Sequence, residues 1–231
     1  MENARAELVE RFFTGTGQSY DLVVRLCTLG CDVYWKRRLL AKVPPSQAIL
    51  DLACGTGIVT FALAKRHPQA RLVGVDVTEE YLQVARQKAQ TRGVKAEFIH
   101  ANAETVTLTG MFDCITSSYI PKYVDADVLL ANITPHLQSG GVIVLHDFLY
   151  PQHPLPRALW HVYNRALNFL GRIFFPEWKE VFDNNLTELI VRSKWLDDFS
   201  TALRRHGYTN IEIERLTFGS AAIISAKKKK E

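Results

Sequence analysis

The stretch Ile49-Leu50-Asp51-Leu52-Ala53-Cys54-Gly55-Thr56-Gly57 decides the fold of this chain. The apolar run at 48–52 predicts a buried parallel strand, and the residues after the glycines, 58–65, have helical spacing. Glycine has no Cβ, so the backbone N–H groups of such a turn can lie against a ligand. Because open α/β sheets bind their ligands at the carboxyl ends of the strands, the stretch predicts a binding site at this turn.

A second acidic residue marks the same edge of the predicted sheet. Asp76 stands nineteen residues after Gly57 and ends a predicted strand at 71–75. A carboxylate there suits the two hydroxyls of a ribose. The turn has neither the Gly-x-Gly-x-x-Gly pattern nor a following Lys-Ser/Thr pair, which disfavours a dinucleotide or a triphosphate. The residues therefore predict a nucleoside ligand without a polyphosphate, and S-adenosylmethionine has that chemistry.

Residues 51–57 resemble motif I of the class I S-adenosylmethionine-dependent methyltransferases. Over most of its length the chain is similar to the ubiquinone/menaquinone biosynthesis C-methyltransferase family. The other segments similar to that family are 20–22, 29–30, 35–37, 101–104 and 112–116. The resemblance implies S-adenosyl-L-methionine as the cofactor and a ring carbon of a hydrophobic, quinol-like molecule as the methyl acceptor.

Two segments depart from the family. Where the family usually has Gly-Leu-Arg-Asn-Val, this chain has Ile120-Pro121-Lys122-Tyr123-Val124, and His146-Asp147 stand where it usually has a glutamate. Lysine does not replace the fork-shaped contacts of arginine. Two alternatives therefore stay open. One is an N- or O-methyltransferase for a phospholipid head group or a small phenolic metabolite, and the other is a scaffold that binds the cofactor without turnover.

The cofactor residues follow partly from the strand–turn pattern and partly from the resemblance. The resemblance places Tyr20 near the carboxylate end of the cofactor, Asn102 and Ala103 at the adenine, and Ser118 at a further cofactor contact. The predicted set is Tyr20, Asp51, Ala53, Gly55, Thr56, Gly57, Asp76, Val77, Asn102, Ala103 and Ser118.

Methyl transfer from a sulfonium requires alignment and exclusion of water, and it requires neither a metal nor a nucleophilic residue. Loss of a phenolic proton would make the ring carbon of a hydroquinone more nucleophilic, so a base near the methyl group would help. His146 is the expected base near neutral pH, although a histidine at a strand end can also be only hydrogen-bonded. The predicted catalytic set is His146, Asp147, Tyr119 and Lys122.

Alternating strands and helices predict a Rossmann-like α/β domain with a seven-stranded sheet. The sheet is expected to be mainly parallel with an antiparallel edge strand, and to have helices on both faces. The predicted strands are 48–52, 71–75, 95–100, 112–116, 142–145, 208–216 and 218–226. The predicted helices are 4–13, one capped by Asp21, 35–40, 58–66, 79–92, 125–137, 156–174 and 194–206. The single domain divides into a helical cover (1–45), a cofactor-binding core (46–150), a helical substrate lid (151–190), a closing helix and strand pair (191–226) and a basic tail (227–231).

The predicted lid is rich in aromatic residues with interleaved arginines: Trp160, Tyr163, Phe169, Phe174, Phe175, Trp178, Phe182, Arg157, Arg165 and Arg172. It is either a packed helix that seals the core or an apolar lid over the substrate pocket that also contacts a bilayer surface. The basic tail is expected to be solvated, with attraction to anionic lipid as the alternative.

Composition sets the remaining expectations. The 231 residues are 47% hydrophobic and 23% charged, as in an ordinary globular protein. The net charge of +4 comes largely from the tail, which argues against a nucleic-acid groove. The four cysteines are expected to be reduced and to bind no metal. Without a signal peptide or a membrane span, the expected location is the cytoplasm, with the membrane surface as an alternative. A homodimer stays open.

Overall fold

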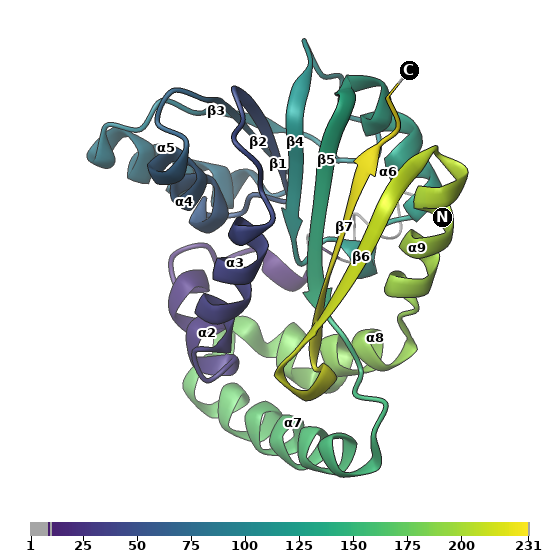
Figure 1. Cartoon of the computed structure of the whole chain (residues 1–231). Coiled ribbons are helices and arrows are strands. Elements are labelled where there is room, and N and C mark those ends of the chain that lie inside the picture. Colours follow the sequence, from purple (N-terminus) through teal and green to yellow (C-terminus); the bar gives the residue numbers. More distant parts are fainter. Residues whose placement is uncertain (1–8, 10, 231) are drawn as a thin grey trace.

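The computed structural model describes residue 9 and residues 11–230. Its centre is a seven-stranded sheet in the order β3-β2-β1-β4-β5-β7-β6 (Figure 1). The strands are β1 (Ala48–Leu52), β2 (Arg71–Asp76), β3 (Glu97–His100), β4 (Phe112–Ser118), β5 (Leu137–Phe148), β6 (Tyr208–Leu216) and β7 (Ala221–Lys228). Strands β1 to β5 pair in parallel, and β7 runs antiparallel to both of its neighbours, β5 and β6. The predicted Rossmann-like fold is confirmed.

Helices cover both faces of this sheet (Figure 1). The α-helices are α2 (Tyr20–Cys27), α3 (Cys31–Ala41), α4 (Ile58–Arg66), α5 (Glu79–Arg92), α6 (Ala126–Ile133), α7 (Pro154–Phe174), α8 (Leu186–Arg192) and α9 (Trp195–Arg205). Short helical turns follow at η1 (Pro121–Tyr123), η2 (Thr134–His136), η3 (Pro176–Trp178), η4 (Val181–Asn185) and η5 (Thr217–Gly219).

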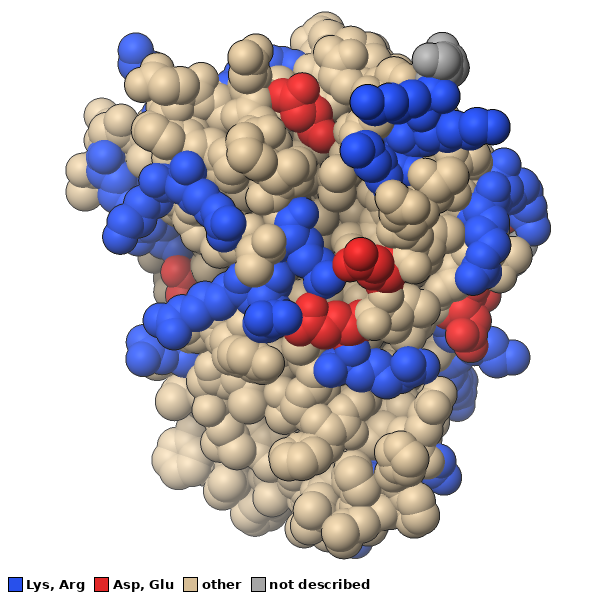
Figure 2. Space-filling model, in the orientation of Figure 1, with Lys and Arg blue, Asp and Glu red and all other residues tan. Residues whose placement is uncertain are grey.

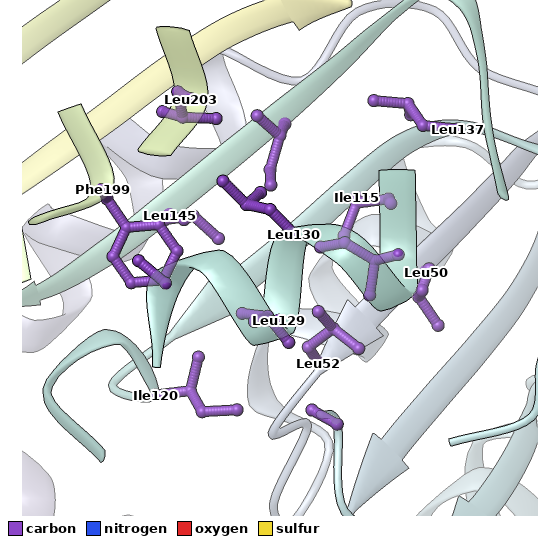
Figure 3. Packing of buried hydrophobic residues seen from close by; sticks show 14 of the residues in the cluster. Leu50, Leu52, Ile115, Ile120, Leu129, Leu130, Leu137, Leu145, Phe199 and Leu203 are labelled. Carbon is purple, nitrogen blue, oxygen red and sulfur yellow. The ribbon is translucent and has the colours of Figure 1, made fainter. Parts of the chain in front are cut away.

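Alternate residues of each central strand enter two different apolar layers, as the pleat of a strand requires. In β4, Cys114 packs with α3 and α4 on one face, whereas Ile115 packs with α6 and α9 on the other. Figure 3 shows the second layer, in which Leu129 and Leu130 of α6 and Phe199 of α9 lie over the strands. Both faces of the central strands are therefore buried, and the carboxyl ends of these strands are left for a ligand.

Several predicted boundaries were wrong. β5 begins at Leu137 and ends at Phe148, so it is far longer than the predicted 142–145. The predicted helix 125–137 ends at Ile133 because Pro135, which has no N–H, lies in the turn η2. Strand β3 begins at Glu97 and helix α3 at Cys31. The structure adds η4 and α8 after the predicted lid helix. The predicted helix 4–13 lies mostly outside the described residues, of which 9 and 11–13 are helical.

Two predictions at the ends of the chain were also wrong. Asp21 does not cap α2, since it lies in the first turn and accepts hydrogen bonds from Thr56 Oγ1 at 2.5 Å and Lys88 Nζ at 2.6 Å. The basic tail does not begin at Lys227, because β7 continues through Lys228. Lys228 Nζ donates to the carbonyl oxygens of Thr134 and Leu137, at 2.9 and 2.8 Å. These carbonyls give the ammonium group a fixed place.

The cover and the lid cross the carboxyl edge of the sheet from two directions, with α2 and α7 at the same end of the molecule (Figure 1). The cover is tied to α5, since the Glu80 carboxylate accepts hydrogen bonds from the backbone N–H groups of Gly15 and Gly17 at 2.7 and 2.8 Å. The lid helix reaches η4 closely at Gly171, where a Cβ would stand only 2.6 Å from the Phe182 ring. Both elements are thereby held over the predicted binding edge.

Candidate active site

A cavity of about 340 Å³ lies between the carboxyl edge of the sheet, the cover and the lid. Its volume is within the range of small-molecule sites, which begins at roughly 300 Å³. Strand ends form its floor, and α2 and α7 form its walls. A second, smaller cavity adjoins it and is lined by some of the same residues: Tyr20, Ala53, Gly55, Ser118 and Tyr119.

The glycine turn brings backbone to the cavity wall. Ala53 and Gly55 line the cavity, and both have left-handed backbone angles, with φ of 50° and 54°. Gly57 has a φ of 86°, and a Cβ there would lie 2.5 Å from the Phe61 ring, so this glycine is needed to join β1 to α4. In the part of the chain that the structure describes, neither cavity is lined by Thr56 or Gly57. The Thr56 hydroxyl instead donates a hydrogen bond to the Asp21 carboxylate.

Asp76 lies at the cavity wall and is held on both sides. One carboxylate oxygen accepts from Gly55 N and the other from Thr78 N, each at 2.8 Å. Burial raises the pKa of Asp76, although these two backbone donors favour its charged form. The side chain is thus fixed in place, and since a carboxylate oxygen can accept more than one hydrogen bond, a ribose hydroxyl could also donate to it.

Asp51 lines the smaller cavity only. Its carboxylate accepts hydrogen bonds from Thr60 Oγ1 at 2.6 Å and from Thr116 Oγ1 at 3.0 Å. Burial raises the pKa of Asp51 to about 6. The other predicted cofactor residues, which all line the main cavity, are Tyr20, Val77, Asn102, Ala103 and Ser118.

The four predicted catalytic residues divide into two pairs. Tyr119 and Lys122 line the main cavity, whereas His146 and Asp147 are fully buried outside it. Tyr119 has a φ of 79°, a strained value for a tyrosine, and its ring stacks on Phe148 with centroids 4.7 Å apart. Strain of this kind is often found at functional sites. The structure thus brings Tyr119 and Lys122 to the cavity.

His146 contacts three residues that line the cavity but does not line it itself: its ring centroid lies 5.0 Å from that of Tyr119 and 5.7 Å from that of Trp35, and its third such neighbour is Ser118. Its Nδ1 lies 3.0 Å from Ser118 Oγ, and its Nε2 is buried with no hydrogen-bond partner among the described residues. Burial, with the nearby Lys36 and Lys122 charges, lowers the pKa of His146 well below its usual value. The imidazole is therefore neutral at physiological pH, and its role as the base stays a prediction.

Lys122 and Asp147 form a buried ion pair beside the cavity. Lys122 Nζ lies 2.8 Å from Asp147 Oδ1 and also donates to the carbonyl oxygen of Tyr119 at 2.8 Å. Burial lowers the pKa of Lys122 and raises the pKa of Asp147. The negative charge of Asp147 opposes the first shift, and the positive charge of Lys122 opposes the second. The pair fixes the backbone on which Tyr119 is held.

Sequence reasoning missed Asp32. This residue of α3 is 4% exposed, and its carboxylate accepts a hydrogen bond from Tyr119 OH at 2.5 Å and another from Lys36 Nζ. An Asp and a Lys four residues apart on a helix usually form a solvent-exposed pair. Here both are buried, because α3 packs on the sheet with this side inward. Only that packing distinguishes the pair from an ordinary surface pair.

Tyr123 also lines the cavity, and its role was not predicted. Its hydroxyl is buried with no hydrogen-bond partner among the described residues. An unsatisfied buried polar group costs roughly 1–3 kcal/mol, and a bound ligand oxygen would relieve that penalty. The only sequence signal was the departure from the family at this position, where a tyrosine replaces an asparagine.

Comparison with known proteins shows the family to which this chain belongs. The profile of the ubiE/COQ5 methyltransferase family matches residues 1–228. A demethylmenaquinone methyltransferase of Thermus thermophilus is 32% identical over 216 residues, covering 91% of this chain and 97% of that protein. A ubiquinone/menaquinone biosynthesis C-methyltransferase of Francisella tularensis is 28% identical over 219 residues, covering 91% and 87%.

Solved structures share the fold at low identity. Phosphoethanolamine N-methyltransferase 2 of Haemonchus contortus, in complex with S-adenosyl-L-methionine, superposes with a TM-score of 0.64 at 15% identity, over 84% of this chain and 52% of that one. An S-adenosylmethionine-dependent methyltransferase of Clostridium acetobutylicum gives 0.59 at 15% identity, over 84% and 91%. With a motif I turn at β1 and a match along nearly the whole sequence, the chain belongs to the ubiE/COQ5 methyltransferase family and is an S-adenosylmethionine-dependent methyltransferase.

Proposed function

We propose that this enzyme methylates a ring carbon of a hydrophobic, quinol-like acceptor. The observation that supports this most directly is that one cavity joins two chemically different halves. Asp76 and Asn102 line one end, and the aromatic and aliphatic side chains of the lid line the other. The acceptor's ring would lie between them, next to Tyr119.

The first half has the groups that S-adenosyl-L-methionine needs. The fixed Asp76 carboxylate suits the ribose hydroxyls, and Asn102 and the Ala103 backbone suit the adenine. Tyr20 and Asp51 lie toward the smaller cavity, where the amino-acid end would bind. When bound, this cofactor supplies an electrophilic methyl group. The chain's own residues have to orient the acceptor and exclude water.

The second half can hold the ring and move a proton. Tyr119 Oη donates to Asp32 and keeps a lone pair with which to accept a phenolic proton from the acceptor. Asp32 would take the tyrosine proton at the same time, so the phenolate forms without a free tyrosinate. Burial and the nearby Asp32 raise the pKa of Tyr119 well above its usual value, which disfavours a standing tyrosinate. Tyr123 OH is free to donate to a second ring oxygen.

The names of the relatives support the same acceptor class. The Thermus protein is named a demethylmenaquinone methyltransferase and the Francisella protein a ubiquinone/menaquinone biosynthesis C-methyltransferase. Because the acceptor-side residues of this chain depart from the family at Lys122 and Tyr123, the identity of the acceptor has to be tested directly.

The test supplies methyl-labelled S-adenosyl-L-methionine with three acceptors: a reduced, short-chain demethylated naphthoquinol, phosphoethanolamine and a simple catechol. The expected product carries the label on a ring carbon of the quinol, which NMR distinguishes from an O-methyl or N-methyl group. Label on phosphoethanolamine nitrogen or catechol oxygen, with none on the quinol, would overturn the proposal.

A variant at the ring-binding end sharpens this test. Tyr123→Phe removes a hydroxyl expected to bind the acceptor, so the KM for the quinol should rise roughly three- to tenfold, as for one lost hydrogen bond. The matched control is Tyr208→Phe, because Tyr208 OH binds Thr134 Oγ1 at 3.0 Å and does not line the cavity. Equal KM values for both variants would remove Tyr123 from acceptor binding.

A further inference from the structure

The cover and lid helices have apolar residues on two sides. On α7, the side chains of Trp160, Tyr163 and Leu167 line the cavity. A second stripe on the same helix points to solvent: Leu155, Leu159, Val162, Phe169 and Ile173. Its steps of four, three, seven and four residues place all five side chains on one face of the helix. A helix that only seals a core would have polar residues on that outer face.

The cover helix α2 repeats this pattern. Val23, Val24 and Cys27 face the cavity, whereas Leu22, Leu26 and Leu29 form an exposed stripe with helical spacing. The two helices are joined at the cavity, since Tyr163 OH donates to the carbonyl oxygen of Cys27 at 2.7 Å. Their outer stripes therefore belong to one end of the molecule.

A third element adds an apolar tip. Phe218 is 86% exposed in the turn η5 between β6 and β7, where Thr217 and Phe218 both have left-handed angles, with φ of 44° and 55°. Among the described residues, thirteen of the seventeen exposed large hydrophobic side chains come from α2, the turn after it, α3, α7 and η5. Figure 2 shows this end of the molecule as mostly uncharged, below a sheet region crowded with charged side chains. We call this surface the outer apolar face.

The mouth of the cavity opens within the outer apolar face. Leu29 lines the cavity although it is 76% exposed, so it stands at the rim. Thr217 and Ser220 line the cavity on either side of the exposed Phe218. A molecule that enters the site therefore passes between the apolar side chains of this face.

The charges on the outer apolar face are mainly positive. No Asp or Glu occurs at 22–31, 154–174 or 216–221, whereas these segments contain Arg25, Arg157, Arg165 and Arg172. The charge of Arg172 is offset by Asp183, 3.0 Å away, and Asp21 at the start of α2 pairs with Lys88. Two copies meeting through this face would oppose arginines to arginines and close the mouth of the cavity. An anionic lipid surface instead matches both the apolar stripes and the positive charge. No helix of the described residues is long and apolar enough to cross a membrane, so the contact would lie in the plane of the interface.

We propose that the outer apolar face docks on a bilayer containing anionic lipid, so that a lipid-dissolved acceptor enters the cavity directly from the membrane. The second part of this statement rests on the proposed function, but the docking itself does not. Apolar patches of this extent on soluble domains mark interaction sites, and binding of such faces grows with the apolar area inserted and with attraction to anionic lipid.

The experiment is vesicle flotation of the full chain with phosphatidylcholine alone and with phosphatidylcholine plus phosphatidylglycerol. The protein is expected to float with the mixed vesicles and less with the neutral ones. The double variant Leu159→Gln and Phe169→Gln should lower vesicle binding at least about tenfold, since two side chains would no longer insert. Glutamine keeps helix propensity. Val128→Gln is the matched control, because Val128 is an exposed valine on α6, outside the face.

A second double variant tests the contribution of the positive charges to vesicle binding. Arg25→Gln with Arg165→Gln should weaken binding to the mixed vesicles about thirtyfold and leave binding to neutral vesicles unchanged, because each arginine near an anionic surface contributes about 1 kcal/mol. Lys229→Gln with Lys230→Gln should change neither affinity. These lysines follow β7 at the opposite end of the sheet, where the Lys230 side chain lies beside Gly140 near the start of β5.

Three results would overturn the proposal. One is a chain that floats with neither vesicle. Another is a chain whose binding is lost with the Lys229 and Lys230 variants and kept with the Leu159 and Phe169 variants. The third is a dimer that the Leu159 and Phe169 variants convert to a monomer without any vesicle binding. Methylation of a water-soluble, short-chain quinol is measured in parallel. This activity should persist in the variants at Leu159 and Phe169 and in those at Arg25 and Arg165. A wrong docking proposal would therefore show in the flotation result, and a wrong function assignment in the methylation result.

Discussion

Tyr119 and Asp32 are joined by a hydrogen bond of 2.5 Å although they lie 87 residues apart in the chain. Tyr119 follows the end of β4 and Asp32 belongs to the cover helix α3. Tyr119 faces the cavity, and Asp32 lies behind it. A proton accepted by the tyrosine would therefore have a carboxylate to move to.

Tyr119→Phe should lower kcat by a factor of about 10² or more while leaving the Kd of the cofactor unchanged, because general-base catalysis contributes roughly 10²–10⁴. Steady-state kinetics and calorimetry measure the two quantities. Asp32→Asn should also lower kcat, and both defects should shrink for a quinol whose phenolic pKa is lower. If Tyr119→Phe and Asp32→Asn both keep the wild-type kcat, and a folded His146→Ala variant is slow, then the base is His146 instead.

Asp76→Ala should weaken cofactor binding at least about tenfold, since a hydrogen bond to a charged group contributes roughly 1.5–3 kcal/mol. Asp113→Ala is the matched control. Asp113 also accepts from two backbone N–H groups, those of Gln47 and Ala48 at 2.7 and 2.9 Å, but it lies at the opposite end of the sheet. Calorimetry with equal affinities for both variants would contradict the assigned ribose site.

Lys122→Met should lower the free energy of unfolding by about 3–5 kcal/mol, because it leaves the carboxylate of Asp147 buried without a counter-charge. Lys179→Met is the comparison. Lys179 pairs with Asp183, but its side chain is 70% exposed, and such pairs contribute about 0–1 kcal/mol. Urea denaturation measures both changes. Similar small losses in the two variants would mean that Asp147 is protonated or solvated without Lys122.

Asp51 should make stability fall as pH rises. Its folded-state pKa of about 6 lies above the value of about 3.9 in an unfolded chain, so folding favours its neutral form. That contribution is fully present below about pH 4 and is lost as pH rises through about 6. Between about pH 4.5 and 7.5, Asp51→Asn should gain roughly 1–3 kcal/mol of unfolding free energy relative to the wild type.

Urea denaturation of the two proteins at both pH values gives this difference. Taking the difference cancels the titration of the other buried carboxylates, such as Asp76 and Asp147. A gap between the two proteins that stays constant with pH would show that Asp51 titrates at its ordinary value.

The sequence by itself determined the sheet and the position of the cofactor edge. The run before Gly55 was predictable as a buried strand because it is apolar apart from Asp51. Asp76 was expected beside it because consecutive βα units place strand ends at one edge. Glycine turns and apolar strands are local signals, so neighbouring residues carry enough information to predict them.

Tertiary packing alone decided which polar side chains became partners. The Asp32–Lys36 pair has the spacing of a surface ion pair, and only the docking of α3 buries it against Tyr119. In the same way, His146 ends a strand as expected, but its neighbours bury it outside the cavity. The two-sided helices α2 and α7 show the physical reason. Spacing groups the residues of each stripe, but the placement of the whole chain decides which stripe faces the cavity and which faces outward.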